Sequence, residues 1–312
     1  MRETKEPVLV LGSAGFIGSA LCSKLASQGR PVCALGRSEH TGALGPITHL
    51  RGSIEDKHLL REAVARCSTL VYTASISTPA TSAADPALEV IGNLLPLSRV
   101  LECAADFPGR HLVYLSSGGT IYGDLATNAS EDFPLRPRSY YGAGKAAAEA
   151  LLHACVATSD WTATSLRPSN LFGPGQPVSK GFAIVPTLFD RASDGEPFQI
   201  WGDGSIVRDY CYIDDLIRAI IAATTVAQTK RFNVYNVANG RTTSILELVK
   251  ACERASGQHI QVEFKPPRGV DVPSVSPSAK AIREDLGWSA EIDLETGLRR
   301  TWEWRQQSTP SN

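Results

Sequence analysis

The chain has 312 residues, of which 43% are hydrophobic and 20% are charged, and its formal net charge at pH 7 is -1. This composition is typical of a globular protein with one large or two modest domains, and the balanced charge gives no general attraction to nucleic acid or to an anionic membrane. No stretch is apolar and long enough to span a bilayer, and the charged first residues do not resemble a signal peptide.

The seven cysteines include no Cys-x-x-Cys pair. An odd number with this spacing argues against a disulfide framework and against a structural metal site. We therefore expect a cytoplasmic protein that holds no metal and binds neither nucleic acid nor membranes.

The first predicted strand is Val8–Leu11, a continuous apolar run of the kind that is buried on both faces of a parallel sheet. It leads into three glycines, Gly12, Gly15 and Gly18, and then into a helix that ends at Gly29. Strand, glycine turn and helix in this order indicate a dinucleotide site, because glycine lets the backbone approach a pyrophosphate at the helix N-terminus. The glycines follow the spacing Gly-x-x-Gly-x-x-Gly, where the common fingerprint is Gly-x-Gly-x-x-Gly.

The second predicted strand, 31–35, ends at Gly36, Arg37 and Ser38. An acidic residue at this strand end would bind the adenosine ribose and favour NAD. Gly36 instead leaves room, and Arg37 with Ser38 could hold a 2′-phosphate. The sequence therefore favours NADP slightly over NAD. The alternative is that Arg37 is a solvated surface side chain and the ribose is bound elsewhere.

Further strands alternate with helices through the first half of the chain. Alternation at these intervals predicts a doubly wound parallel sheet in the α/β class. Ligands bind at the carboxyl ends of such strands, and we assign Ile54, Ala74 and Asn93 to the cofactor and Ser77 to the substrate. The remaining strands are expected near 48–54, 69–74, 111–116 and 162–167, and one long helix is expected from about 86 to 105.

Tyr141 and Lys145 stand four residues apart in a predicted helix. That spacing places both side chains on one face of the helix, one turn apart. A lysine ammonium beside a phenol favours the phenolate, so we expect Lys145 to lower the pKa of Tyr141 from its reference of about 10. The pair would then transfer a proton near neutral pH.

The pattern changes after Arg167, where a stretch dense in turn residues is followed by shorter, mixed elements. We predict a dinucleotide-binding domain over 1–167 and a smaller mixed α/β substrate lobe over 168–312, with some segments of the second part returning to the first.

Together these motifs resemble the extended short-chain dehydrogenase/reductase family, in its nucleotide-sugar epimerase/dehydratase branch. The resemblance covers nearly the whole chain and implies a Rossmann domain with a smaller sugar-nucleotide lobe. It depends on the following motifs: Gly12/Gly15/Gly18, the loop 116–123, Tyr141/Lys145, the segment 167–175, and Arg208-Asp209-Tyr210.

The resemblance implies roles for individual residues. Tyr141 would be the catalytic acid and base, and Lys145 would hold the nicotinamide ribose. Asn170 and Arg208 match positions that contact the diphosphate of a sugar nucleotide, although Arg208 could instead pair with a neighbouring aspartate. Arg268 resembles a late Arg-x-x-Asp element near the nucleotide. The pyrophosphate would be lined by Gly12, Gly15, Phe16, Ile17 and Gly18.

One position departs from the family pattern. The galactose epimerases carry a Ser or Thr in the loop after the fifth strand that hydrogen-bonds the sugar hydroxyl being oxidised, and Gly118 stands there in this chain. Thr120 is our first choice for the missing hydroxyl and Ser117 the second, unless both cap the strand end locally. The Asp-Glu pair of the dehydratases is also missing, which argues against 4,6-dehydration.

The resemblance implies an NAD(P)-dependent nucleotide-sugar 4-epimerase that acts through a transient 4-keto sugar on a nucleoside-diphosphate sugar. The alternative is an NADPH-dependent 4-keto-sugar reductase that uses the same residues once. A non-catalytic dinucleotide-binding protein is disfavoured because the Tyr141/Lys145 pair is intact. The family also implies a homodimer formed by the helices near 87–105 and 141–157, and a role in polysaccharide biosynthesis.

Overall fold

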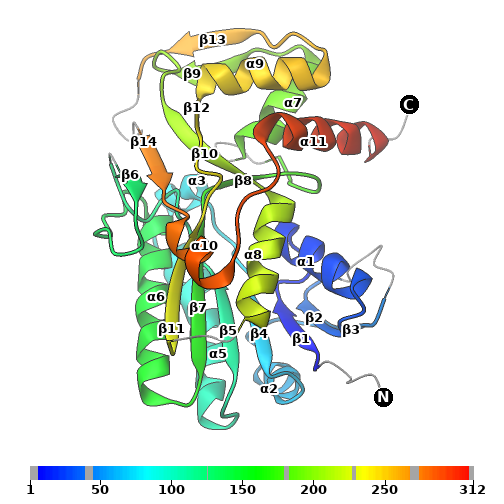
Figure 1. Ribbon diagram of the computed structural model, residues 1–312, viewed down its shortest axis with the longest axis vertical. Coiled ribbons are helices and arrows are strands. Elements are labelled where there is room, and N and C mark those ends of the chain that lie inside the picture. The colour runs from blue at the N-terminus through cyan, green and yellow to red at the C-terminus, as the bar shows by residue number, and fades with distance from the viewer. Residues whose placement is uncertain are drawn as a thin grey trace. The chain divides into compact units, whose positions relative to one another are not determined.

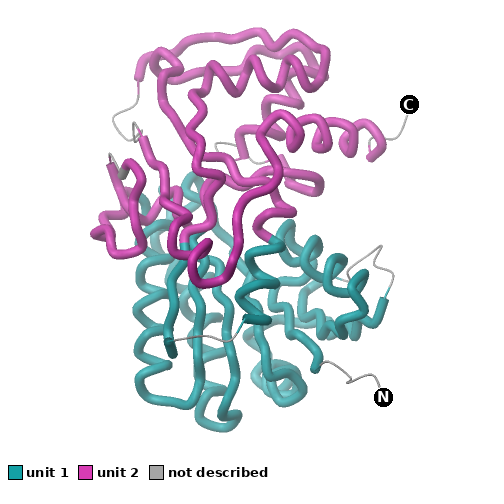
Figure 2. The backbone as a smooth tube through the Cα atoms, in the orientation of Figure 1, with its two compact units in different colours: residues 1–116, 139–167, 217–235 teal, residues 117–138, 168–216, 236–312 magenta. Residues whose placement is uncertain are grey.

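The computed structural model describes residues 6–38, 45–124, 126–178, 183–226, 230–267 and 274–308 (Figure 1). The chain forms two compact units, and each is assembled from three separate stretches (Figure 2). Unit 1 comprises residues 1–116, 139–167 and 217–235, and unit 2 comprises residues 117–138, 168–216 and 236–312.

Unit 1 is built on a seven-stranded sheet with the order β11-β7-β5-β4-β1-β2-β3. Strands β3, β2, β1, β4, β5 and β7 pair in parallel along this order, so the predicted doubly wound parallel sheet is confirmed. The strands are β1 (Val8–Leu11), β2 (Val32–Gly36), β3 (Ile47–Arg51), β4 (Thr69–Tyr72), β5 (His111–Leu115), β7 (Thr162–Pro168) and β11 (Phe232–Val237).

Helices of unit 1 flank this sheet (Figure 1). Right-handed crossovers place α1 on one face and α2, α5 and α6 on the other. The core on the second face combines Leu70 and Leu112 of the sheet with Leu60, Leu97 and Leu152 of the helices, all at most 1% exposed. The helices are α1 (Phe16–Ser27), α2 (Lys57–Ala65), α3 (Pro79–Ala84), α4 (Ala87–Glu89), η1 (Val90–Leu94), α5 (Leu95–Glu102), η2 (Cys103–Ala105), α6 (Tyr140–Thr158) and α8 (Ile213–Thr225), the last shared with unit 2.

The single helix predicted from about 86 to 105 is wrong in detail. The structure divides that stretch into α4, a π-helical turn η1, α5 and a short 3-10 turn η2. Pro96 gives the physical reason, because it lacks the N–H that an α-helix would bond to the carbonyl of Gly92. The preceding turn widens instead, and π-helical turns of this kind are frequent at functional sites.

Unit 2 contains a sheet with the order β12-β10-β14-β6, and β8 also pairs with β10. Strands β9 and β13 form a separate parallel pair. The elements of unit 2 are β6 (Ala126–Ala129), β8 (Asn170–Phe172), α7 (Ile184–Asp194), β9 (Phe198–Trp201), β10 (Val207–Tyr212), β12 (Thr242–Ser244), α9 (Ile245–Ser256), β13 (Val262–Lys265), β14 (Ser274–Pro277), α10 (Lys280–Leu286) and α11 (Leu294–Ser308).

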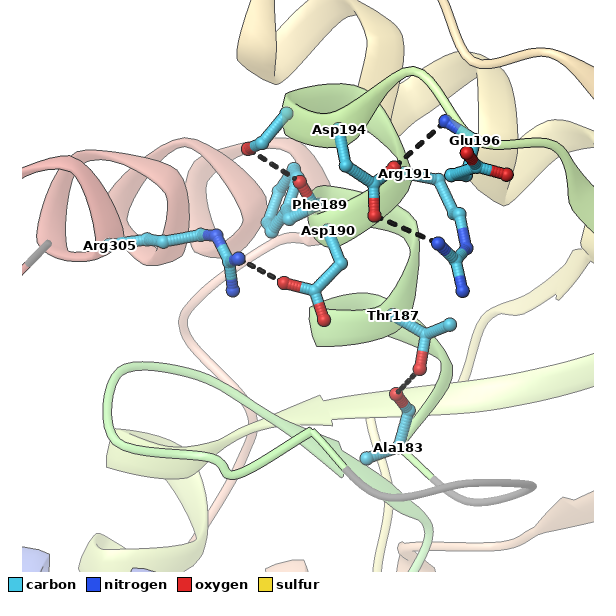
Figure 3. Close-up of polar contacts among 9 residues, drawn as sticks. Ala183, Thr187, Phe189, Asp190, Arg191, Asp194, Glu196 and Arg305 are labelled. Carbon is cyan, nitrogen blue, oxygen red and sulfur yellow. Dashed lines mark hydrogen bonds and ion pairs between the residues drawn. The ribbon is translucent and has the colours of Figure 1, made fainter.

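Helix α7 contacts α11 through an apolar pair and through an ion pair, and Figure 3 shows the ion pair. The rings of Phe189 and Trp302 lie 5.2 Å apart, and Arg305 forms an ion pair with Asp190. The start of α7 is fixed locally, where the Thr187 hydroxyl donates to the carbonyl of Ala183 at 3.0 Å. These contacts anchor one end of unit 2 without involving the predicted site residues.

All seven cysteines are free thiols. Over the part of the chain that the structure describes, no helix is long and apolar enough to cross a membrane.

Candidate functional site

The glycine turn lies between β1 and α1, at the point where the strand order reverses. Gly12 has φ +89°, and a Cβ there would lie 2.7 Å from the backbone nitrogen of Ala74. A Cβ on Gly18 would collide with the carbonyl oxygen of Gly12. The turn therefore needs glycine at both positions, for its backbone conformation and for close packing of α1 on β1. Open α/β sheets bind ligands at such reversal points.

The N-terminus of α1 is open to an anion. Its N-cap is Gly15, no side chain caps the first turn, and that turn carries no acidic residue. Gly15 is exposed, while Phe16 and Ile17 are half-buried. The first N–H groups of a helix have no intrahelical partner, and the helix dipole favours negative charge there. The turn thus fits the pyrophosphate of a dinucleotide.

The end of β2 lies beside the glycine turn. A Cβ on Gly36 would lie 2.9 Å from the hydroxyl oxygen of Ser13. Arg37 and Ser38 are exposed at the strand end, as a side chain that reads a 2′-phosphate would be. The preference for NADP stays a prediction. Of the other predicted cofactor contacts, Ile54 is 9% exposed and follows β3.

Tyr141 and Lys145 lie on α6, which begins at the N-cap Ser139. The hydroxyl of Ser139 accepts the N–H of Gly142 at 3.1 Å, and Ser82 of α3 accepts the N–H of Tyr141 at 3.2 Å. The Nζ of Lys145 lies 5.5 Å from the centre of the Tyr141 ring and donates to the carbonyl of Leu115 at 2.8 Å. The expected pairing on one face of the helix is present.

The expected pKa of Tyr141 is wrong in direction. Burial raises the pKa of Tyr141 well above its usual value, and the charge of Glu89 raises it further. Burial lowers the pKa of Lys145 to about 8, against the opposing effects of Glu89 and Glu149. The sequence argument considered only the Tyr141/Lys145 pair, whereas desolvation and a third, acidic side chain decide the direction.

Asn93, Ser77 and Glu89 form a hydrogen-bonded group in unit 1. The Asn93 amide donates to the Ser77 hydroxyl at 2.7 Å and to Oε2 of Glu89 at 2.9 Å, and its oxygen accepts the N–H of Ile76 at 3.1 Å. Both amide hydrogens are thus committed within the protein. Asn93 fixes the loop after β4, where Ser77 is 6% exposed.

The loop after β5 holds the candidate hydroxyls. The Oγ1 of Thr120 is buried and has no hydrogen-bond partner among the described residues. Gly118 donates its N–H to Pro168 at 2.7 Å, and Ser117 is half-buried. A buried hydroxyl without a partner lowers stability by about 1–3 kcal/mol, so Thr120 is better suited than Ser117 to hydrogen-bond a ligand.

Two predicted substrate contacts lie together in unit 2. Strand β10 pairs with β8, and Tyr210 of β10 lies opposite Asn170 of β8. Arg208 stands two residues before Tyr210 in β10. The Asn170 amide donates to the carbonyl of Asp209 at 3.0 Å, and the Nη1 of Arg208 donates to the carbonyl of Val207 at 2.8 Å. Gly119 of the Thr120 loop approaches Asn170, since a Cβ there would lie 3.5 Å from its Oδ1.

Arg268 lies outside the described residues. No cluster of His, Cys, Asp and Glu side chains suited to a metal ion occurs within the described ranges.

Sequence reasoning missed Glu89 and Ser82. Glu89 stands four residues before Asn93, and this spacing on a helix could have indicated a contact. Ser82 lies three residues after Pro79, in a stretch for which no helix was predicted, although Pro at the first helical position and Thr78 before it are helix-start signals.

Comparisons with known proteins identify the family of this chain. Residues 8–238 match the NAD dependent epimerase/dehydratase family. UDP-glucose 4-epimerase of Mycolicibacterium smegmatis is 32% identical over 95% of this chain and 97% of its own length. The dTDP-4-dehydro-6-deoxyglucose reductase of Escherichia coli is 25% identical over 96% of this chain and 97% of its own.

Among solved structures, that of MoeE5 in complex with UDP-glucuronic acid and NAD superposes with a TM-score of 0.90 at 29% identity, covering 97% of this chain and 100% of that one. The chain therefore belongs to the NAD dependent epimerase/dehydratase family, which confirms the resemblance drawn from its motifs. It is an NAD(P)-dependent enzyme of the nucleotide-sugar epimerase and reductase group.

Proposed function

We propose that this chain is a nucleotide-sugar 4-epimerase that removes and returns hydrogen at C4 of a nucleoside-diphosphate hexose. One observation carries the proposal: Tyr141 and the buried Lys145 lie one turn apart on α6, in the same unit as a glycine turn that fits a pyrophosphate. A proton-transferring pair and a dinucleotide site are the two requirements of transient oxidation.

The residues that would hold the dinucleotide are those of the glycine turn and the N-terminus of α1. Arg37 would contact the adenosine ribose or its 2′-phosphate, and Lys145 would contact the nicotinamide ribose. The nicotinamide, when bound, supplies a hydride acceptor and donor. Gly12 and Gly18 support this assignment because a side chain at either would collide with neighbouring backbone and distort the turn.

Tyr141 would take the proton of the sugar 4-hydroxyl and give a proton back to the 4-keto sugar. Because burial favours its neutral form, Tyr141 is set to donate, and the phenolate needed for the first step depends on a nearby positive charge. The ammonium of Lys145 provides that charge while it remains protonated. Thr120 would hydrogen-bond the reacting oxygen in place of the family's residue at Gly118.

We propose a UDP-hexose as the substrate, since the M. smegmatis relative is a UDP-glucose 4-epimerase and MoeE5 binds UDP-glucuronic acid. Asn170 and Arg208 would bind the diphosphate. A guanidinium fork can bond two phosphate oxygens at once.

The test is to incubate the purified chain with UDP-galactose or UDP-glucose and to follow interconversion by chromatography. Nucleotide released on denaturation identifies the retained cofactor as NAD or NADP. Tyr141→Phe should abolish turnover, whereas Tyr140→Phe, which alters an exposed neighbour, should not. Turnover by Tyr141→Phe close to that of the wild type would contradict the proposed role.

A 4-keto-sugar reductase is the second candidate. It is favoured by the absence of a hydroxyl at Gly118 and by the similarity to the E. coli dTDP-4-dehydro-6-deoxyglucose reductase. A reductase would consume NADPH in proportion to an added dTDP-4-keto-6-deoxy sugar and leave UDP-hexoses unchanged. Thr120→Ala should slow either reaction more than Ser117→Ala does.

We further propose a homodimer that forms through α6 and the helices η1 and α5. Large apolar side chains are exposed on these packed helices, among them Val90 (57%), Ile91 (61%), Leu95 (38%) and Leu151 (37%). A second copy of the same face would cover this patch. The wild type should sediment with twice the chain mass and Ile91→Lys with one chain mass, and a wild-type monomer would contradict the assignment.

A further inference from the structure

Glu89 is a buried acid that the proposed reaction does not use. Its side chain is 4% exposed, and only one of its oxygens has a partner among the described residues, the Asn93 amide at 2.9 Å from Oε2. The other oxygen, Oε1, is buried without a hydrogen bond. Burial of a carboxylate with incomplete hydrogen bonding is costly, and folding alone would be better served by a neutral side chain.

Gly144 lets this carboxylate reach helix α6. A Cβ on Gly144 would lie 2.6 Å from Oε2 of Glu89, so any larger residue would displace the carboxylate. Gly144 precedes Lys145 and follows Tyr141 by three residues. The acid of α4 therefore lies against the turn of α6 that carries the proton-transferring pair.

The other ionisable groups around the pair come from three elements. Tyr114 of β5 has its ring centre 5.0 Å from the Nζ of Lys145, and Tyr72 of β4 packs against Tyr114 with ring centres 5.7 Å apart. Glu149 lies one turn beyond Lys145 but is held by Arg167, with 2.6 Å between Nη2 and Oε2. Glu89 is thus the acid near the pair that forms no ion pair within the part of the chain that the structure describes.

We propose that Glu89 is a positioning residue for the Tyr141/Lys145 pair: its buried carboxylate keeps Lys145 a cation and favours the phenol form of Tyr141, which gives a proton back to the 4-keto sugar. The catalytic role of Glu89 rests on the proposed function. Asn93 holds the carboxylate in place and links it through Ser77 to the loop after β4. Removal of the charge should therefore let both groups lose their protons at lower pH.

The effect can be measured on Lys145 without any substrate. Chains labelled with 13C-lysine give a 13Cε resonance for each lysine, and the signal of Lys145 is identified by its loss in Lys145→Arg. The wild-type signal should titrate near the pKa of about 8 that burial imposes on Lys145. In Glu89→Gln this pKa should fall by about 1, since a nearby opposite charge shifts a pKa by about 1–3.

Three variants separate the charge from packing. Glu89→Asp keeps the charge and should titrate as the wild type does, and Gly144→Ala, which displaces the carboxylate, should lower the pKa in the same direction as Glu89→Gln. Glu102→Gln removes an exposed acid at the end of α5 and should have no effect. An unchanged Lys145 pKa in Glu89→Gln, or an equal fall in Glu102→Gln, would overturn the proposal.

The pH dependence of kcat is a second readout, which tests whether the charge of Glu89 affects catalysis. The pH profile of kcat should move toward acid in Glu89→Gln by a similar amount, while KM for the nucleotide sugar stays within about twofold. A pH profile that does not move while the Lys145 pKa falls would overturn the catalytic role of Glu89. If the wild type turns over no nucleotide sugar at all and the NMR shift is still seen, the proposed function fails and the electrostatic role of Glu89 is supported.

Discussion

Replacement of Gly18 by Ala tests the fit of α1 against β1. Ala is favoured over Gly inside a helix by about 1 kcal/mol. Against this gain, the new methyl would collide with the carbonyl oxygen of Gly12 and lie 2.9 Å from the Gly12 carbonyl carbon and the Ser13 Cα. All three atoms are backbone, so α1 must move away from the sheet. Overpacking costs about 1–3 kcal/mol, and this rigid contact lies at the upper end.

The net loss is therefore about 2 kcal/mol, which lowers Tm by roughly 4–8 °C for a unit of this size. Thermal unfolding followed by circular dichroism measures the difference. Gly15→Ala is the matched control: its Cβ would lie 3.4 Å from the Gly12 carbonyl, an ordinary contact, and its cost at an N-cap is below about 1 kcal/mol. It should instead weaken NAD binding in calorimetry. A Tm of Gly18→Ala within about 1 °C of the wild type would refute the expected backbone collision.

Two other perturbations give distinct outcomes. Arg167→Met leaves the buried Glu149 carboxylate without its bidentate partner and should lower the free energy of unfolding by about 3–5 kcal/mol, as measured by denaturant unfolding. The double variant Arg167→Met/Glu149→Leu should recover most of this loss. No recovery in the double variant would refute a pairing role for Arg167. Lys145 has a folded-state pKa of about 8, below its unfolded value, so the unfolded chain binds more protons between pH 8 and about 10.4. Wild-type stability should therefore rise by up to about 3 kcal/mol over this range relative to Lys145→Met, and parallel pH curves for the two would refute the shift.

The parts of the site that the sequence predicted are those coded by local patterns. The glycine turn was predictable because a buried strand, a turn and a helix follow one another within twenty residues, and backbone sterics at Gly12 and Gly18 demand glycine. The Tyr141/Lys145 pair was predictable because helical spacing alone places both side chains on one face. The parallel sheet followed from the alternation of strands and helices.

The parts that were missed depend on contacts between distant segments. Glu89 meets α6 only in the folded chain, and burial of Tyr141, together with the Glu89 charge, reverses the pKa direction that the local pair suggested. Ser82 supports the N–H of Tyr141 from 59 positions away. The break at Pro96 was visible in the sequence, but the apolar periodicity of the surrounding stretch outweighed it in the prediction.

The three-part construction of each unit has a consequence for synthesis. Strand β7 pairs on one side with β5 and on the other with β11, which begins only at Phe232. During translation, unit 1 therefore lacks its edge strand until about three-quarters of the chain has been made, as the boundary at residue 235 of 312 implies. Until then β7 presents unpaired backbone, the kind of edge that invites wrong pairing. A nascent chain halted after Arg167 should consequently need a chaperone, and one halted well beyond Val237 should not.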